Sequence, residues 1–209
     1  MISLFLDTAS TKIIVALYKD NTLITKIEED NDNRLSERLL PTISKIIEEN
    51  NLTLKQINEI IVVNGPGSFT GIRIGVTVAK TMGYSLKITV KTISELAVLA
   101  TTKVSTPYVC PYIDARRESI YTGLYDQFAT ALIEDQYIRV SDWKEQLATK
   151  TSNQNVTFVG YGLDETIKPE INYEVLPILF NRLPKQNPHQ VNPNYLKKTE
   201  AEEKLHGSD

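Results

Sequence analysis

Residues 59–86, EIIVVNGPGSFTGIRIGVTVAKTMGYSL, constrain the fold more than any other stretch of the chain. They begin with an apolar, β-branched run, 60–63, that is short enough to be a buried strand. A glycine-proline loop follows, and Ser68 and Thr70 then offer hydroxyl groups of the kind that cap the first turn of a helix. The sequence therefore predicts a buried strand, a tight loop and a helix in direct succession.

The predicted helix carries a small residue at every fourth position. These residues are Gly71, Gly75, Ala79 and Gly83. Each glycine weakens a helix by roughly 1 kcal/mol relative to alanine, so another interaction must favour glycine here. Residues four apart form one ridge on a helix surface, and a ridge without side chains lets another backbone come close. We interpret this ridge as a contact surface for another subunit.

Composition limits the class of protein. The chain has 209 residues, of which 41% are hydrophobic, and this is enough for a packed core. A formal net charge of −3 argues against a broad electrostatic surface for nucleic acid. Cys110 is the only cysteine, so no internal disulfide can form, and we expect it to be a small buried side chain. Without a long apolar run, we expect a soluble, cytoplasmic protein with no membrane partner.

The first half alternates strands and helices. We expect an antiparallel meander over 2–6, 13–18 and 22–28, followed by a helix over Leu35 to Glu49 with a kink at Pro41. The apolar face of this helix contains Leu35, Leu39, Ile43, Ile46 and Ile47. After residues 59–86 we expect a strand at 88–90 and a helix that starts at Ser94.

The second half repeats the first weakly. At an offset of 107 residues, LFLDTASTKIIVALYKD aligns with CPYIDARRESIYTGLYD, which pairs Asp7 with Asp114. Both copies read as strand, acidic residue, polar turn and strand, which favours duplication over chance. We therefore expect an α/β protein with two related lobes, residues 1–103 and residues 104–209. A charged helix is expected at 199–205.

Two sets of residues are candidates for binding nucleotides or anions. The loop with Gly65, Gly67 and Ser68 lies between a strand and a helix, where backbone amides can hold phosphate, but its spacing is not that of a P-loop; the alternative is a tight turn. Asp7 and Asp114 each end a strand, so a cleft between the lobes could place both carboxylates near a metal-nucleotide. The alternative is that each simply bonds backbone amides in its own turn.

Other catalytic machinery is scarce. The only histidines, His189 and His206, lie in the proline-rich and terminal segments, so a serine-histidine-aspartate triad or a histidine metal site is not expected. No helix start or histidine lies near Cys110 in the sequence to activate its thiol. We therefore predict no catalytic residue and no metal ligand.

Five motifs occur in order along most of the chain: LFLDTAS, RLSERLLP, NGPGSFTGIRIG, YIDARRESIYTGLYD and PNYLKK. Together they resemble the bacterial TsaB (YeaZ) family, and NGPGSFTGIRIG is the most specific of them. The resemblance implies two RNase H-like lobes of the actin-like ATPase superfold. Two departures are visible: Thr8 rather than glycine follows Asp7, and the segment from Phe180 to Asn192 is short and rich in proline, so the second lobe is expected to be reduced.

The resemblance also implies a function. Family members assist the synthesis of threonylcarbamoyladenosine in tRNA as non-catalytic subunits that bind a TsaD-type transferase, which is their paralogue, together with a TsaE-type ATPase. The transferase binds a metal through two histidines on its first helix, whereas Leu35 to Glu49 contains none here. The chain would then have no cofactor of its own, meet ATP or ADP only at the complex interface, contact tRNA only through the complex, and form a homodimer when alone.

Two function hypotheses from different classes remain open. In the first, the chain is an activating scaffold whose first helix and glycine-containing helix pack against the same helices of the transferase. The partner-binding residues are then predicted to be Leu35, Leu39, Ile43, Thr70, Gly71, Ile72, Gly75, Val78, Ala79, Met82 and Gly83. In the second, it is an actin-like kinase or hydrolase that uses Asp7 and Asp114.

Overall fold

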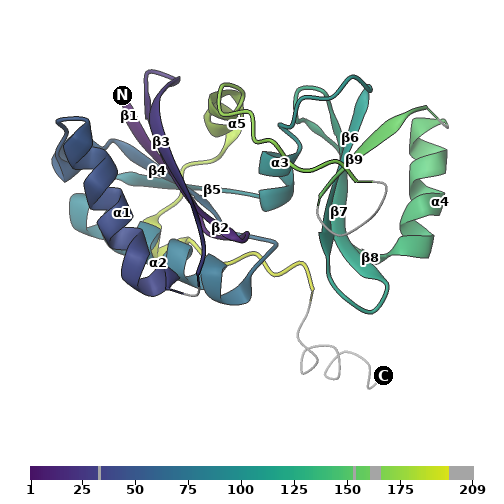
Figure 1. Cartoon of the computed structure of the whole chain (residues 1–209), viewed down its shortest axis with the longest axis horizontal. Helices are drawn as coiled ribbons and strands as arrows, with labels where there is room; N and C mark the ends of the chain where they lie inside the picture. The colour runs from purple at the N-terminus through teal and green to yellow at the C-terminus, as the bar shows by residue number, and fades with distance from the viewer. Residues whose placement is uncertain (33, 153, 161–165, 198–209) are drawn as a thin grey trace.

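The computed structural model describes residues 1–32, 34–152, 154–160 and 166–197, and its two sheets lie side by side with helices packed around them (Figure 1). The first sheet has the strand order β3-β2-β1-β4-β5. Its strands are β1 (Ile2–Asp7), β2 (Lys12–Lys19), β3 (Thr22–Asp30), β4 (Glu59–Val63) and β5 (Thr89–Ile93). The first three pair antiparallel, whereas β4 pairs parallel with both β1 and β5. This arrangement is RNase H-like, as expected.

The second sheet repeats this topology with one strand fewer. Its order is β8-β7-β6-β9, formed by β6 (Tyr108–Asp114), β7 (Ser119–Asp126), β8 (Ala131–Arg139) and β9 (Val156–Gly160). β6, β7 and β8 pair antiparallel and β9 lies parallel to β6, as in the first sheet. Among the described residues no strand corresponds to β5. The predicted duplication and the predicted reduction of the second lobe are both confirmed.

The helices lie between the strands and around the sheets. They are α1 (Leu35–Glu49), α2 (Phe69–Leu86), α3 (Glu95–Leu99), α4 (Val140–Thr151) and α5 (Leu176–Arg182), with short 3₁₀ turns η1 (Leu54–Gln56) and η2 (Pro188–Gln190). None of them, within the described part of the chain, is long and apolar enough to cross a bilayer. The charged helix expected at 199–205 lies outside the described residues.

Side-chain caps mark the starts of α2 and α3, whereas α1, α4 and α5 begin without one. The Ser68 hydroxyl accepts a hydrogen bond from the Gly71 amide at 3.2 Å and so caps α2 as predicted, and Ser94 caps α3 in the same way. Pro41 does not end α1, which runs through this residue as one helix, and the kink expected there stays a prediction. The Pro41 side chain is exposed, so the sheet does not constrain it.

α2 packs against the first sheet through its ridge of small residues. The Thr8 hydroxyl donates a hydrogen bond to the Gly71 carbonyl oxygen at 2.8 Å. A Cβ atom on Gly71 would lie 2.0 Å from the Thr8 carbonyl oxygen, and one on Gly75 would lie 2.3 Å from the Thr8 hydroxyl oxygen. Further along, a Cβ on Gly83 would meet Val90 of β5 at 2.4 Å. The glycines therefore serve a contact inside this chain.

This packing corrects the predicted role of the ridge. Gly71, Gly75, Ala79 and Gly83 are all buried within the chain itself, so they cannot lie on a surface that meets another subunit. The sequence pattern correctly indicated a close backbone approach. The partner in that approach is the β1–β2 turn and β5.

The C-terminal segment corrects the predicted domain range 104–209. After β9 the chain returns to the first lobe, where the ring of Phe180 stacks on Phe5 with the centroids 5.6 Å apart. Lys91 of β5 donates to the Phe180 carbonyl oxygen at 3.0 Å, and its ammonium group forms a buried ion pair with Glu59 at 2.9 Å. The first lobe is therefore completed by α5 and the residues that follow it.

Val90 and Lys91 of β5 also show which face of the first sheet is covered by α2 and which by α5. Val90 contacts Gly83 of α2, whereas Lys91 contacts α5. Because successive side chains of a strand point to opposite faces, α2 and α5 cover opposite faces of the first sheet. α1 packs beside α2, on β2 and β3.

The glycine contact predicts that Gly75→Ala destabilises the chain, although alanine favours helix. The added methyl group must displace Thr8 or shift α2, and we expect the free energy of unfolding to fall by roughly 1–3 kcal/mol. The measurement is urea denaturation followed by circular dichroism. Thr77→Ala, at an exposed position of the same helix, is the matched control and should change stability little. A Gly75→Ala protein as stable as the unmodified chain would contradict this packing.

Candidate functional site

The exposed sides of α1 and α2 form a candidate contact surface, which we call the outer face. On α2, Ile74, Val78 and Met82 recur every four residues and are half-buried against the core. On α1, Leu40 is 53% exposed although it lies three and seven residues from the buried Ile43 and Ile47, on the same side of that helix. Thr70 is exposed near the start of α2. The outer face consists of Leu40, Thr70, Ile74, Val78 and Met82.

The outer face retains only part of the predicted partner-binding set. Thr70, Val78 and Met82 lie on it. Leu35, Leu39, Ile43 and Ile72 are instead buried in the core of the first lobe, as are the four small residues of α2. An apolar helical stripe first covers its own sheet, so the residues with the clearest periodicity were the least available to another protein.

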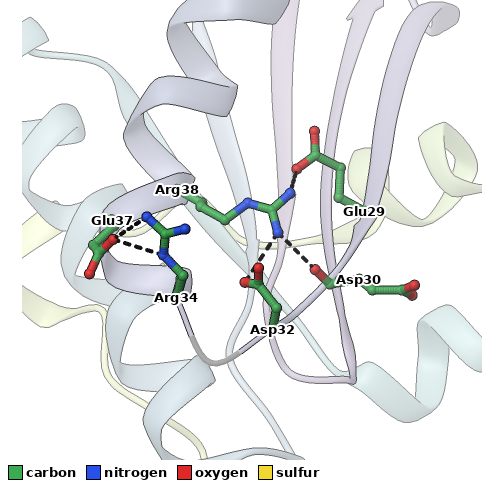
Figure 2. A network of polar contacts seen from close by, with 6 residues as sticks. All are labelled: Glu29, Asp30, Asp32, Arg34, Glu37 and Arg38. Atoms are coloured by element: carbon green, nitrogen blue, oxygen red, sulfur yellow. Dashed lines mark hydrogen bonds and ion pairs between the residues drawn. The ribbon is translucent and has the colours of Figure 1, made fainter.

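Ion pairs fix the start of α1 beside β3 (Figure 2). The Arg38 guanidinium donates to the Asp30 carbonyl oxygen at 3.1 Å and pairs with Asp32 at 3.2 Å and with Glu29. The Arg38 guanidinium lowers the pKa of the Asp32 carboxyl group. Arg34 pairs with Glu37 one turn along, at 2.8 Å. Because Arg38 connects α1 to the strand before it, it sets the position of α1 and hence of Leu40.

The glycine loop before α2 contacts the chain's own backbone. Gly65 and Gly67 have φ values of +126° and +152°, which favour glycine. A Cβ on Gly67 would lie 2.3 Å from the Ala9 carbonyl oxygen, and one on Gly65 would lie 2.6 Å from that of Asn194. The Ser68 amide donates to the same Ala9 carbonyl at 2.7 Å. These contacts favour the tight-turn interpretation over the anion site.

Asp7 ends β1 in a buried environment beside Glu95 of α3. The Asp7 carboxyl accepts a hydrogen bond from the Ala9 amide at 2.8 Å, and its other oxygen, like one oxygen of Glu95, is buried with no hydrogen-bond partner among the described residues. Both side chains are at most 2% exposed. Two buried carboxyl groups that lie close together resist being ionised at the same time, so Asp7 and Glu95, here called the carboxyl pair, influence each other's ionisation.

Burial governs the titration of the carboxyl pair. It raises the pKa of Asp7 to about 6, although the Ala9 amide and Glu95 oppose the shift. Burial and the nearby charge of Asp7 raise the pKa of Glu95 well above its usual value. The pair therefore favours the half-protonated state at neutral pH.

Asp114 occupies the corresponding turn of the second lobe but not a corresponding environment. Its carboxyl group accepts a hydrogen bond from the Arg116 amide at 2.8 Å, as Asp7 does from Ala9, yet Asp114 is exposed. The two aspartates were predicted to address one cleft. Instead, each closes its own turn, and only Asp7 meets a second acidic side chain.

A cavity of about 380 Å³ lies on the first lobe beside the carboxyl pair. Its polar lining includes Lys12, Lys26, Glu28, Glu95 and Lys168. Partial burial would raise the pKa of Glu28, but the ammonium groups of Lys12 and Lys26 outweigh it and lower this pKa to about 2. Asp114 is absent from the described residues that line the cavity, so the cavity does not join the two aspartates.

A second polar contact joins the lobes. Asp135 of β8 accepts hydrogen bonds from Ser94, at the start of α3, and from the Tyr125 hydroxyl group of β7. Burial raises the pKa of Asp135. α3 thus connects to both lobes, through Glu95 on one side and Ser94 on the other.

The remaining candidates for catalysis have structural roles. Cys110 is buried and accepts a hydrogen bond from the Trp143 indole at 3.2 Å, and burial raises the pKa of its thiol to about 11. His189 stacks edge-on against Tyr84, with the centroids 4.8 Å apart. His206 lies outside the described residues. In the part of the chain that the structure describes, no three His, Cys, Asp or Glu side chains are grouped as metal ligands.

Sequence reasoning missed Glu95, Leu40 and Ile74. Glu95 follows Asp7 by 88 positions and appears in the sequence only as an acidic residue in the first turn of a helix, where such residues are common. Leu40 was hidden beside the stronger stripe that contains Leu39 and Ile43. The signal for Leu40 in the sequence was its spacing of three residues from Ile43 and seven from Ile47, which places it at the edge of that stripe.

The carboxyl pair predicts that stability falls as the pH rises from about 4 to about 6. The unfolded chain releases the Asp7 proton near the ordinary value of 3.8, whereas the folded chain holds it to about 6. The folded state therefore binds more protons in this window, and raising the pH removes on the order of 2–3 kcal/mol of unfolding free energy.

Asp7→Asn should remove the part of this loss that Asp7 contributes, whereas buried Glu95 still contributes its own part, and urea denaturation at several pH values would measure the difference. Asp114→Asn, at the exposed turn of the second lobe, is the matched control and should keep the slope of the unmodified chain. An Asp7→Asn protein with an unchanged slope would show that the pair does not titrate in this way.

A family model described as TsaD, tRNA N6-adenosine threonylcarbamoyltransferase, matches residues 28–204. The tRNA threonylcarbamoyladenosine biosynthesis protein TsaB of Bacillus subtilis is 33% identical over 181 residues, which cover 84% of this chain and 77% of that protein. TsaB of Escherichia coli is 32% identical over 127 residues, which cover 59% of this chain and 54% of that protein.

Solved structures show the same fold. YeaZ from Pseudomonas aeruginosa superposes with a TM-score of 0.72 at 23% identity, covering 93% of this chain and 99% of that one. A P. aeruginosa structure described as similar to peptidase YEAZ has a TM-score of 0.78, also at 23% identity, over 94% of this chain and 99% of that one. With the sequence matches to B. subtilis and E. coli, these findings show that the chain belongs to the TsaB (YeaZ) family, within the wider TsaD-type family.

Proposed function

We propose that the chain is an accessory subunit in the synthesis of threonylcarbamoyladenosine in tRNA, and that it binds the TsaD-type transferase through its outer face. The names of the B. subtilis and E. coli relatives support the pathway. The outer face is the observation that supports binding to the transferase, because it marks a surface for a protein partner.

The outer face has the chemistry of a protein interface. Leu40 exposes about half of its surface on α1, and Ile74, Val78 and Met82 are partly exposed apolar side chains of α2, which packs beside α1. Contiguous exposed apolar surface on a helix pair gains free energy when another protein covers it. The ion pairs of Arg38 connect α1 to the residues before it, so α1 is held in place before any partner binds.

The transferase belongs to the same wider family, which supports a symmetric mode of association. Two related folds can place equivalent helix pairs against each other about an approximate two-fold axis, so that the interface contains four helices. The same argument predicts that the chain forms a homodimer through the outer face when the transferase is absent. An ATPase of the TsaE type would bind elsewhere on the assembled complex, with ATP or ADP held at the complex interface.

The positions of the acidic side chains support an accessory role. The kinase or hydrolase hypothesis needs Asp7 and Asp114 to act on one metal-nucleotide. Here Asp7 accepts a hydrogen bond from the Ala9 amide in a buried site, whereas Asp114 accepts one from the Arg116 amide in an exposed turn. Both carboxyl groups are thus used in structure, and neither is directed at a shared ligand.

Val78→Asp tests the proposal directly. A carboxylate at the centre of the outer face must be desolvated when the transferase covers it, so we expect affinity to fall at least about tenfold. Titration calorimetry with the purified transferase would measure the affinity, and reconstituted threonylcarbamoylation of tRNA should fall in parallel.

Ile178→Asp is the matched control, because Ile178 is 49% exposed on α5, on the opposite face of the first sheet. It should leave both affinity and tRNA modification unchanged. If the Val78→Asp chain binds the transferase as tightly as the unmodified chain, the outer face is not the interface. Sedimentation of both variants without the transferase would test whether the same face forms the homodimer.

A further inference from the structure

A second cavity, of about 350 Å³, lies between the start of α2, the C-terminal segment and the second lobe. Phe69 and Arg73 line it from α2, Tyr195 and Lys197 from the C-terminal segment, and Tyr121 from β7. It is separate from the cavity beside the carboxyl pair, with which it shares no lining residue. Its lining combines aromatic rings and positive charges.

The aromatic side chains of this cavity remain accessible. Phe69 is 56% exposed and Tyr195 is 43% exposed, although their rings stack with centroids 5.5 Å apart. The Arg73 guanidinium lies 3.8 Å from the centre of the Phe69 ring and donates to the Tyr195 hydroxyl oxygen at 2.7 Å. Two planar groups and a guanidinium are thus held in fixed positions before any ligand arrives.

Among the described residues, no carboxylate forms an ion pair with the positive charges of the cavity, which are Arg73 and Lys197. Lys197 lies instead over the ring of Tyr137, 5.1 Å from its centre, and Tyr137 packs against Tyr121. In a chain whose net charge is −3, this is a local positive site bordered by aromatic rings.

We propose that this cavity binds an unpaired nucleotide of RNA, with the base against the Phe69, Arg73 and Tyr195 cluster and a phosphate at Lys197. Bases that have left a helical stack bind to aromatic rings and guanidinium planes, and cations hold the backbone phosphate. A base-paired nucleotide would not expose its face in this way. This proposal rests on the proposed function, because it gives the subunit a direct contact with the tRNA.

The test measures binding of a labelled RNA stem-loop with a single-stranded loop by fluorescence anisotropy, using the full chain in complex with the transferase. Phe69→Ala should weaken RNA binding about tenfold, since one stacking surface is lost. Lys197→Ala should weaken it and also reduce the dependence of log affinity on log salt by about 0.7, the value for one phosphate contact on a single strand.

Matched controls come from the same region of the chain. Tyr84→Ala removes an aromatic ring that is 65% exposed on α2 but outside the cavity, and Lys87→Ala removes a nearby exposed cation. Both should bind RNA as the unmodified complex does. Calorimetry with the transferase is run on every variant, so that loss of complex formation is distinguished from loss of the RNA contact.

Two outcomes would overturn the RNA site without affecting the proposed function. In the first, the Phe69→Ala and Lys197→Ala complexes form normally and bind the stem-loop as tightly as the unmodified complex. In the second, the two substitutions weaken binding of free AMP but not of RNA, which would identify the cavity as a mononucleotide site. A fully paired RNA duplex, used as a further probe, should be insensitive to Phe69→Ala.

Discussion

The contact between Thr8 and the glycines of α2 determines where every candidate surface of this protein lies. Thr8 donates to the Gly71 carbonyl oxygen, and the neighbouring Ala9 carbonyl accepts from the Ser68 amide. These bonds join the β1–β2 turn to the start of a helix some sixty residues later, and the absence of side chains at Gly71 and Gly75 makes room for Thr8. Because the contact fixes the rotation of α2 about its axis, it also fixes which residues of α2 face outward.

Each side of α2 therefore has its own role. The glycine side is covered by the sheet, Ile74, Val78 and Met82 form a partly exposed apolar row, and the side with Phe69 and Arg73 meets Tyr195 of the C-terminal segment. The proposed transferase interface and the proposed RNA site thus lie on one helix. A rigid element shared by two binding sites keeps their separation constant, which suits a subunit that places a tRNA relative to its partner enzyme.

The sequence predicted the positions of the helices and strands well. It predicted poorly which side of a helix packs against its own chain and which side faces outward. The strand, loop and helix at 59–86, the Ser68 and Ser94 caps and the duplicated topology all follow from local patterns. The period of four correctly indicated a close approach, but a glycine ridge fits a sheet of the same chain as well as a second subunit. Only the position of Thr8, which is a long-range contact, decides between them. The return of Phe180 to the first lobe is likewise set by packing on Phe5 and leaves no periodic signal.

The described part of the second lobe lacks a strand equivalent to β5, which explains why Asp7 and Asp114 differ. Both lobes have the same turn, in which the aspartate carboxyl group accepts a hydrogen bond from the backbone amide two residues later. In the first lobe, β5 leads into α3, and α3 brings Glu95 onto Asp7. The described part of the second lobe has no counterpart of β5, so no equivalent helix covers Asp114, which stays in solvent. The buried carboxyl pair is thus a consequence of the difference between the two lobes. Because of the same difference, the chain does not form a symmetric cleft in which Asp7 and Asp114 would share one ligand.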